Sequence, residues 1–186
     1  IHFAAKKSAP ESILDSLSYY ENNVSGTINL LKIMDIYNCR KIIFSSSASV
    51  YGVEAKLPFT EASLTKPINP YGSTKLIVEK ILKDWIGKNK DKSAIALRYF
   101  NPIGAHKSKL LGEKPKGTPN NLMPNICQVA LGNTRYLKVF GNDFNTRDGS
   151  GERDFIHIAD LAHAHVIASE YSINYPGFNI FNVGTG

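Results

Sequence analysis

The sequence predicts an α/β fold built on an open parallel sheet. Short apolar segments alternate along the chain with segments whose apolar residues recur at helical spacing. The apolar segments are continuous rather than alternating, as in Ile42-Ile43-Phe44, which is typical of strands buried on both faces. Because strands separated by helices pair in parallel through right-handed crossovers, these segments should form one parallel sheet.

The first elements can be placed in order along the chain. We expect a short strand over Ile1–Ala5, then a helix from about Leu17 to Tyr37, then a strand over Lys41–Ser46. The helix is indicated by an apolar residue at every third or fourth position, at Val24, Ile28, Leu31 and Met34. The second strand is indicated by its continuous apolar run.

A second helix should begin near Asn69-Pro70, because Asn suits the position before a helix and Pro suits its first turn. Its apolar stripe runs through Val78, Ile81, Leu82 and Trp85. The remaining expected elements are a strand over Ala94–Tyr99, a helix near Leu122–Leu131, a strand near Tyr136–Phe140, a helix near Ala159–Tyr171 and a strand near Asn179–Val183.

Composition places the chain among ordinary globular proteins. Of its 186 residues 42% are hydrophobic and 20% charged, and no apolar run approaches the length that spans a membrane. The net charge of +6 arises largely from two loop-like stretches, Lys88–Lys92 and His106–Lys116. No basic stripe is interleaved with aromatic residues, so we expect solvated surface rather than a nucleic-acid or membrane partner.

The cysteines and histidines do not indicate a metal site. Cys39 and Cys127 have no second cysteine at metal or redox spacing, which favours two free thiols in a reducing compartment such as the cytoplasm. His163 and His165, two residues apart on an expected helix, face different directions. With His157 they are better explained by helix polarity and surface hydrogen bonds, and we predict no metal.

Both ends of the chain look like interrupted elements. Ile1–Ala5 reads as a strand already in progress, and Phe181–Gly186 reads as a strand cut just after its end. We therefore expect the chain to be part of a longer protein.

Polar side chains follow the expected strands. The residues after the first three strands are Lys6-Lys7, Ser45-Ser46-Ser47 and Phe100-Asn101. In open parallel sheets, ligands bind beyond the carboxyl ends of the strands. The sequence therefore places a candidate site at this edge of the sheet.

The strongest chemical pattern is Tyr71-Gly72-Ser73-Thr74-Lys75. A Tyr and a Lys four residues apart on a helix share one face. A free tyrosine has a pKa of about 10, and a nearby ammonium favours its phenolate form. Tyr71 could then accept a proton from a sugar hydroxyl, with a serine after the preceding strand as hydroxyl partner.

The chain resembles the extended branch of the short-chain dehydrogenase/reductase superfamily, and within it the UDP-galactose 4-epimerase family. The resemblance covers essentially all 186 residues, and several separate segments carry it. They are His2-Phe3-Ala4-Ala5-x-Lys7, Tyr19–Val24, Phe44–Gly52, Asn69–Gly72, Arg98–Pro102, Gly104–His106, Pro119–Pro124, Phe140–Asp143 and Gly151-x-Arg153-Asp154-Phe155-Ile156-His157.

The resemblance implies a fold and a division of the chain. The fold would be a partial Rossmann-like doubly wound parallel sheet with part of a smaller C-terminal substrate domain. Residues 1–101 would be the C-terminal part of an NAD-binding domain whose first strand-helix units are missing. Residues 102–186 would supply substrate-binding segments and returning Rossmann elements, also truncated.

The resemblance also implies a reaction, the NAD-dependent interconversion of UDP-glucose and UDP-galactose. Tyr71 would take the proton from the 4'-hydroxyl, Lys75 would support it and bind the nicotinamide ribose, and Ser47 would bridge Tyr71 and the sugar. Hydride would leave C4' for NAD, the 4-keto sugar would rotate, and the hydride would return to the other face.

Further positions match family residues that line the two ligands. The cofactor-binding set would be Phe3, Ala4, Lys7, Asn22, Ser47, Tyr71, Lys75 and Phe100. The substrate-binding set would be Ser47, Tyr71, Asn101, Asn121, Leu122, Phe140 and Arg153. Family members usually dimerise through a helical bundle, for which the helices over Leu17–Tyr37 and Asn69–Ile86 are candidates, so we expect a homodimer at full length.

Other functions found in this superfamily fit the sequence to different degrees. Nucleotide-sugar dehydratases and decarboxylating relatives usually carry a carboxylate beside the catalytic hydroxyl, whereas Ser47-Ala48-Ser49 has none. A non-catalytic dinucleotide-binding module would typically lose Tyr71 or Lys75. A UDP-uronate 4-epimerase and a truncated, inactive dinucleotide-binding fragment stay open, the latter because the chain has no complete Gly-x-Gly-x-x-Gly turn.

Overall fold

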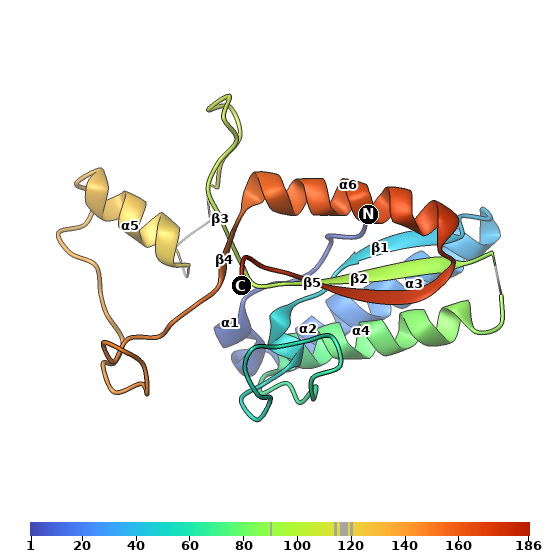
Figure 1. The fold of residues 1–186 in the computed structure, drawn as a ribbon, viewed down its shortest axis with the longest axis horizontal. Coiled ribbons are helices and arrows are strands. Elements are labelled where there is room, and N and C mark those ends of the chain that lie inside the picture. The colour runs from blue at the N-terminus through green and yellow to red at the C-terminus, as the bar shows by residue number, and fades with distance from the viewer. Residues whose placement is uncertain (90, 114, 116–118, 120) are drawn as a thin grey trace.

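The computed structural model describes residues 1–89, 91–113, 115, 119 and 121–186. Lys90, Lys114 and Lys116 of the two basic stretches, and Asn120 of the Pro119–Pro124 motif, lie outside the described residues. The main sheet has three strands, β1 (Lys41–Ser45), β2 (Ser93–Tyr99) and β5 (Gly177–Val183), in the order β1-β2-β5 (Figure 1). Both pairings are parallel, which confirms the predicted α/β class.

The first residues extend this sheet by a single pairing. The His2 amide donates to the Ile43 carbonyl at 2.8 Å and the Ser45 amide donates to the His2 carbonyl at 3.2 Å. His2 and Phe44 thereby form one parallel bridge. The expected strand over Ile1–Ala5 is therefore reduced to one paired residue at the β1 edge.

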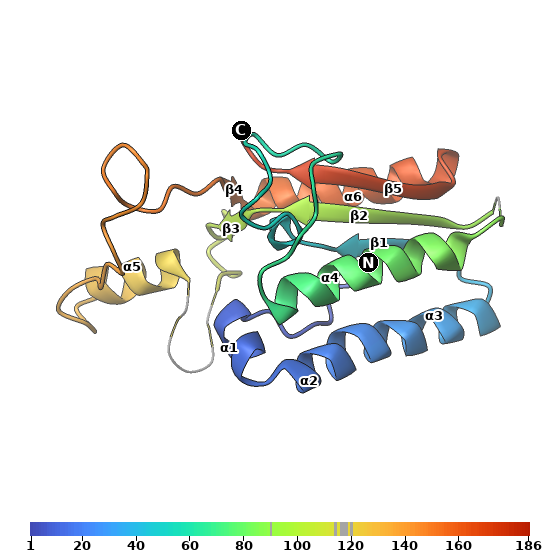
Figure 2. The same cartoon turned by 90° about the horizontal axis from the view of Figure 1, so that it is seen from below.

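Helices cover both faces of the sheet (Figure 2). On one face α3 (Gly26–Ile36) and α4 (Pro70–Ile86) lie side by side, and α6 (Ile158–Asn174) covers the other. Phe44 packs with α3 and α4, whereas its neighbour Ile43 packs with α6. Because successive strand side chains point to opposite faces, this two-sided burial explains the continuous apolar run of β1.

The expected helix from Leu17 to Tyr37 has nearly the expected bounds but is less regular than its periodicity predicts. It is preceded by α1 (Ala9–Leu14) and opens with α2 (Ser16–Tyr19), a π-helical segment (Tyr20–Ser25) and then α3. Ser8 caps α1 by accepting a hydrogen bond from the Glu11 amide. A π-helical segment is common at functional sites, and this one carries Asn22 and Asn23.

The other expected helices are confirmed, and their bounds differ slightly. α4 starts at Pro70 as predicted, α6 runs three residues beyond the expected Tyr171, and α5 (Leu122–Ala130) lies within its expected range. Strands β2 and β5 also match their predictions to within two residues at each end.

The segment between β2 and α6 differs most from the prediction. β3 (Asn101–Ile103) and β4 (Phe155–His157) form a separate parallel pair. The strand expected near Tyr136–Phe140 is wrong, because those residues have no regular structure. A strand needs a neighbour for its backbone hydrogen bonds, and no described segment pairs with this one. In both views α5 stands apart from the sheet (Figures 1 and 2).

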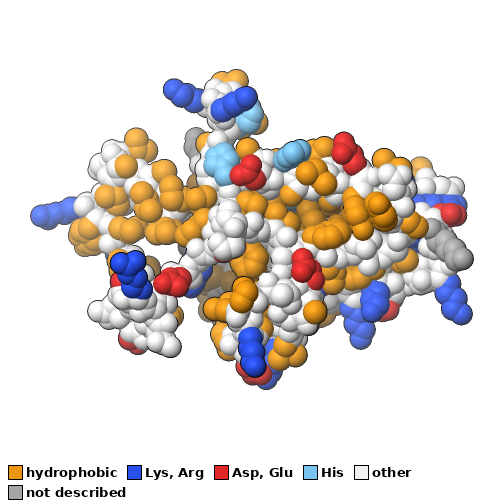
Figure 3. Space-filling view, viewed as in Figure 1, with side chains coloured by type: hydrophobic (Ala, Val, Ile, Leu, Met, Phe, Trp, Pro, Cys, Tyr) orange, Lys and Arg blue, Asp and Glu red, His pale blue; other side chains and the backbone are white. Residues whose placement is uncertain are grey.

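The surface features bear on possible partners. None of the described helices is both long enough and apolar enough to cross a membrane. On the face drawn in Figure 3, the described Lys and Arg side chains lie at separate points and form no continuous stripe. Both cysteines are free and exposed. Among the described residues, no three His, Cys, Asp or Glu side chains group as metal ligands would.

Candidate active site at the carboxyl edge of the sheet

The start of α4 positions two of the predicted site residues. The Asn69 side chain accepts a hydrogen bond from the Gly72 amide at 2.8 Å and so caps the helix that Pro70 begins. Tyr71 then lies in the first turn, where its amide donates to the hydroxyl of buried Ser12 at 3.1 Å. Lys75 follows one turn later on the same face.

The residues from Ser45 to Tyr51, which we call the serine segment, pack compactly against α4. The Ser46 amide donates to the Phe44 carbonyl at 3.0 Å, so the chain turns sharply as the strand ends. Ser47 then caps a short 3₁₀ turn over Ala48–Val50 by accepting from the Ser49 amide at 3.1 Å. Ser45, Ser46 and Ser47 are all buried.

A glycine lets this segment approach the helix. A Cβ atom at Gly72 would lie 2.6 Å from the Ser49 carbonyl oxygen and 2.9 Å from the Pro67 side chain. Only glycine allows so close an approach between α4 and the segment that carries Ser47. Sequence reasoning treated Gly72 as part of the Tyr-Lys pattern and gave it no role of its own.

The partly buried Tyr71 lies beside the buried Ser47. Burial raises the pKa of the Tyr71 phenol, hydrogen bonding to Ser47 lowers it, and the neighbouring Tyr99 phenol raises it. The net direction is upward because burial in a poorly solvated place disfavours the phenolate. The expectation that Lys75 makes this phenol more acidic is therefore wrong for this structure.

Lys75 lies close to this phenol but donates its hydrogen bond elsewhere. Its side chain is only 4% exposed, its Nζ atom donates to the Ser45 carbonyl at 2.6 Å, and that atom lies 5.7 Å from the centre of the Tyr71 ring. The ammonium also faces the Phe44 ring at 4.9 Å. Burial lowers the pKa of Lys75 to about 8, so the amine stays mostly protonated at neutral pH.

Two further hydroxyl groups, those of Ser45 and Tyr99, lie next to Tyr71, Ser47 and Lys75. Ser45 Oγ is hydrogen-bonded to the hydroxyl of Tyr99, which lies at the end of β2. Burial raises the pKa of Tyr99, and the Ser45 hydrogen bond opposes that rise. The site therefore combines two phenols, a serine cluster and one buried ammonium, which suits proton transfer to and from an alcohol.

The residues predicted to bind a cofactor lie around the same edge of the sheet. Phe3 is 58% exposed and its ring lies 4.8 Å from that of His165, while Ala4 and Lys7 are also exposed. Asn22 lies on the π-helical segment and lines a polar groove of about 460 Å³ with Lys6 and Ser18. Phe100 stacks on Phe59 with ring centres 6.3 Å apart.

The residues predicted to bind substrate are only partly brought to this edge. Asn101 begins β3, and its amide and side chain both donate to the Asp154 carbonyl, at 3.2 and 2.9 Å. Four others lie in the segment between β3 and β4 and are exposed, with Phe140 85% exposed. These are Asn121, Leu122, Phe140 and Arg153. The structure does not gather them around Tyr71.

One positioning residue that the sequence analysis missed is Asn23. Its side chain accepts from the Lys6 amide at 2.8 Å and donates to the Lys6 carbonyl at 3.0 Å. It also donates to the Thr74 hydroxyl, next to Lys75, at 3.1 Å. Asn23 thus ties the loop after His2 to α4, and the signal for it was a buried polar residue within an apolar helical pattern.

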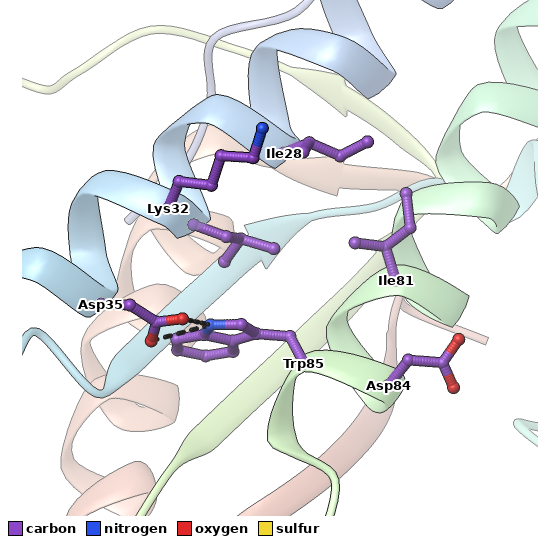
Figure 4. A pocket seen from close by; sticks show the side chains of 7 residues that line it. Ile28, Lys32, Asp35, Ile81, Asp84 and Trp85 are labelled. Atoms are coloured by element: carbon purple, nitrogen blue, oxygen red, sulfur yellow. Dashed lines mark hydrogen bonds between the residues drawn. The ribbon is translucent and has the colours of Figure 1, made fainter.

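A second groove lies away from these residues. It has a volume of about 290 Å³ and runs between α3 and α4 (Figure 4). Its lining is Ile28, Leu31, Lys32, Asp35, Ile81, Asp84 and Trp85. The Trp85 indole donates to the Asp35 carboxylate, at 3.1 and 3.0 Å to its two oxygens, and this groove contains none of the predicted catalytic residues.

Known proteins resemble the whole of this chain in sequence. Curated relatives include a UDP-glucose 4-epimerase of Bacillus subtilis, 50% identical over 186 residues, and one of Yersinia enterocolitica, 53% identical over 188 residues. Each match covers 100% of this chain and 55% of the relative. The chain therefore spans about half the length of these relatives.

Solved structures resemble it in fold. A UDP-glucose-4-epimerase from Stenotrophomonas maltophila, with bound NAD and formylated UDP-arabinopyranose, superposes with a TM-score of 0.95 at 47% identity. One from Bifidobacterium longum, in complex with NAD+ and UDP, superposes with a TM-score of 0.92 at 47% identity. These matches cover 100% and 99% of this chain and 55% of each solved chain.

The family follows from a match along almost the entire sequence. The model of the NAD dependent epimerase/dehydratase family matches residues 1–184. The structural matches share the fold of this chain, which includes the parallel sheet of β1, β2 and β5. The chain therefore belongs to the NAD dependent epimerase/dehydratase family.

Proposed function

We propose that the complete protein carrying this segment interconverts UDP-glucose and UDP-galactose with NAD as cofactor. The observation that carries the proposal is the meeting of Tyr71, Ser47 and Lys75 in one buried site at the carboxyl edge of the sheet. Relatives named UDP-glucose 4-epimerase at 50% and 53% identity support it.

The residues at this edge fit NAD. Lys75 carries three N–H donors, of which one bonds the Ser45 carbonyl, so others are available for ribose hydroxyls. Phe3 offers an exposed aromatic face, and Lys7 and Asn22 offer exposed polar groups around the same edge. NAD would supply hydride acceptance and return at the sugar carbon.

The proton chemistry belongs to this chain. Tyr71 would remove the proton from the sugar 4'-hydroxyl and later give it back, and Ser47 would share a hydrogen bond with both. A protonated Lys75 would stabilise the phenolate while it exists, because the site is poorly solvated and an ammonium acts strongly there. Because burial raises the pKa of Tyr71, the phenol must first release its own proton to solvent before it can accept the proton of the sugar hydroxyl.

The exposed segment between β3 and β4 would bind the nucleotide end of the substrate. Arg153 presents a planar guanidinium suited to the oxygens of a diphosphate, and the exposed Phe140 ring suits the uracil. Asn101, Asn121 and Leu122 would contact the sugar and the diphosphate. In this proposal residues 1–101 form the cofactor domain and residues 102–186 carry the substrate segments.

The complete protein is also proposed to be a cytoplasmic homodimer. The exposed thiols of Cys39 and Cys127 suit a reducing compartment. The groove between α3 and α4 in Figure 4, with the exposed Ile33 and Ile36 on α3, suits the helical contact expected between two copies.

The decisive substitution is Tyr71→Phe in the complete protein. It removes the hydroxyl and keeps the ring, so we expect kcat for UDP-galactose formation to fall by roughly 10²- to 10⁴-fold, with little change in NAD binding. Conversion of UDP-glucose is followed by proton NMR of the anomeric signals, and NAD binding by isothermal titration.

Tyr37→Phe serves as the matched control, because Tyr37 lies exposed at the end of α3, outside the proposed site. It should keep the parent's kcat. A Tyr71→Phe enzyme as fast as the parent would contradict the proposal. Turnover of UDP-glucuronate by a parent that ignores UDP-glucose would replace it with a uronate 4-epimerase.

A further inference from the structure

A buried ion pair joins α4 to β2 directly below the serine segment. Glu79 and Arg98 are each 3% exposed. Arg98 donates to both carboxylate oxygens of Glu79, from Nε at 2.9 Å and from Nη2 at 2.6 Å. Burying two charges is costly and a buried pair is weak evidence for stability, so its other contacts indicate its role.

The carboxylate of Glu79 holds the middle serine of the segment. The Ser46 hydroxyl, fully buried, donates to Glu79 Oε1 at 2.5 Å. Ser46 immediately precedes Ser47, whose hydroxyl bonds Ser49 and lies near enough to the Tyr71 phenol to lower its pKa. The position of Ser47 therefore depends on a neighbour that Glu79 fixes.

One face of α4 meets all three serines. Tyr71, Lys75 and Glu79 follow at intervals of four residues and so lie along one side of the helix. Tyr71 lies near enough to Ser47 for that hydroxyl to lower its pKa, Lys75 donates to the Ser45 carbonyl, and Glu79 accepts from Ser46. Each helix residue thus meets one residue of the segment.

Arg98 holds the other end of the same segment. Its Nη1 atom donates to the Tyr51 hydroxyl at 3.1 Å, and that hydroxyl donates to Asn182 on β5 at 2.5 Å. Tyr51 is fully buried and follows the 3₁₀ turn that Ser47 caps. The ion pair therefore fixes residue 46 through Glu79 and residue 51 through Arg98, with Ser47 between them.

We propose that Glu79 is a positioning residue for catalysis: clamped by Arg98, it holds Ser46 and thereby sets the Ser47 hydroxyl against Tyr71. This inference rests on the proposed function for its effect on turnover, although the structural anchoring can be measured without any turnover. Glu79 touches neither substrate nor cofactor in this role. Its contribution is the alignment of two groups that must meet in the transition state.

The first test is Ser46→Ala in the complete protein, which removes the hydroxyl and leaves the Glu79–Arg98 pair intact. We expect kcat for UDP-glucose to fall roughly 10- to 100-fold with KM nearly unchanged, since alignment matters in the transition state. In a Ser47→Ala background the same change should have little further effect. Ser93→Ala, which deletes an equally buried hydroxyl at the far end of β2, should keep the parent's kcat.

Two double variants test Glu79 without leaving a lone buried charge. Glu79→Gln with Arg98→Met keeps an oxygen that can accept from Ser46, whereas Glu79→Met with Arg98→Met keeps none. Both lose the contacts of Arg98 equally. We expect the first pair to keep much more of the parent's kcat than the second, and the second to lose at least as much as Ser46→Ala, because it also lacks the Arg98 contact with Tyr51.

Amide hydrogen exchange reads the anchoring directly. The amides of Ser49, Val50 and Tyr51 are bonded within the segment. Their exchange should speed up in Ser46→Ala and in the Met–Met variant, but not in Ser93→Ala. Unchanged exchange in the first two variants overturns the inference.

The two proposals fail in distinguishable ways. A parent that turns over no UDP-sugar sinks the epimerase proposal, while the exchange data still decide whether Glu79 and Ser46 hold the segment. Parental kcat in Ser46→Ala, equal losses in the two double variants, or full additivity with Ser47→Ala would each show that Glu79 does not act through Ser47.

Discussion

At the scale of single residues, the distinctive feature is a cation buried beside a phenol. Lys75 is 4% exposed and has no carboxylate partner among the described residues; its contacts are the Ser45 carbonyl and the rings of Phe44 and Tyr71. Such a group lowers stability and persists where function requires it. Its cost appears as a pKa lowered by burial to about 8.

This cost predicts the effect of removing the charge. The gap between the ordinary lysine pKa of 10.5 and about 8 corresponds to about 3 kcal/mol, a net cost that already includes the contacts of the ammonium. Lys75→Met should therefore raise the thermal midpoint of the complete protein at neutral pH, measured by calorimetry without nucleotide. Its activity should fall sharply.

The stability difference between the parent and Lys75→Met should depend on pH. Below about pH 8 folded and unfolded chains both hold the proton, and the folded chain bears the full burial cost. Between about pH 8 and 10.5 the folded chain releases its proton first, so the parent gains stability relative to Lys75→Met. The advantage of the variant should shrink across that window, and an advantage that grows with pH would contradict the account.

At the scale of elements, α4 and the serine segment act as one unit. The helix begins at a capped Asn69-Pro70 pair, places Tyr71 in its first turn, and closes on the segment across Gly72. The catalytic groups are thus set by how closely a helix start can approach a strand end. Small residues at the contact are essential to that distance.

The contact predicts opposite outcomes for two Gly→Ala changes. At Gly72 a methyl group would meet the Ser49 carbonyl, so Gly72→Ala should destabilise the protein by roughly 1–3 kcal/mol and lower kcat. At Gly26, in α3, the same methyl meets nothing within 4 Å, so Gly26→Ala should stabilise by up to about 1 kcal/mol and leave kcat unchanged. Urea denaturation and turnover measure both, and a harmless Gly72→Ala would refute the close approach.

At the scale of the whole molecule, large apolar surfaces are exposed. On α6, Val166, Ile167 and Ile173 are more than half exposed, and Figure 3 shows hydrophobic side chains on the face where α6 and α5 lie. Contiguous apolar surface of this kind marks contact with other parts of a protein. The chain covers 55% of the length of its solved relatives.

This organisation predicts how residues 1–186 behave when produced by themselves. NAD binding in such folds depends on a Gly-rich turn at a helix start, and no complete turn of that kind occurs in this sequence. We expect isothermal titration to detect at most weak NAD binding to these residues alone, and clear binding to the complete protein. Tight, stoichiometric binding to residues 1–186 would refute this.

Sequence patterns identified most of the central sheet and its helices. Periodicity located α4 and α6, and the apolar runs located β1, β2 and β5, because buried elements have a strong repeating pattern. The patterns missed β3 and β4, which are three residues each, and predicted a strand near Tyr136–Phe140 that has no partner. Short or unpaired segments depend on neighbours distant in the sequence.

The sequence likewise predicted some features of the candidate site and missed others. The pairing of Tyr71 and Lys75 was evident from a spacing of four residues, and Ser47 from its place after a strand. The Glu79–Arg98 pair was not evident, because its members lie on different elements, 19 residues apart. Nor was the sign of the Tyr71 pKa change, because the spacing that brings an ammonium near gives no measure of burial.

The sequence alone therefore determined the α/β class, the order of the main elements and the chemical groups at the edge of the sheet, since these follow from local spacing. Only the tertiary structure decided that burial raises the pKa of Tyr71, that Gly72 admits the serine segment, and that an ion pair bonds Ser46 and Tyr51 on either side of Ser47. Solvation and close packing depend on every neighbour of a group, and most of those neighbours are remote along the chain.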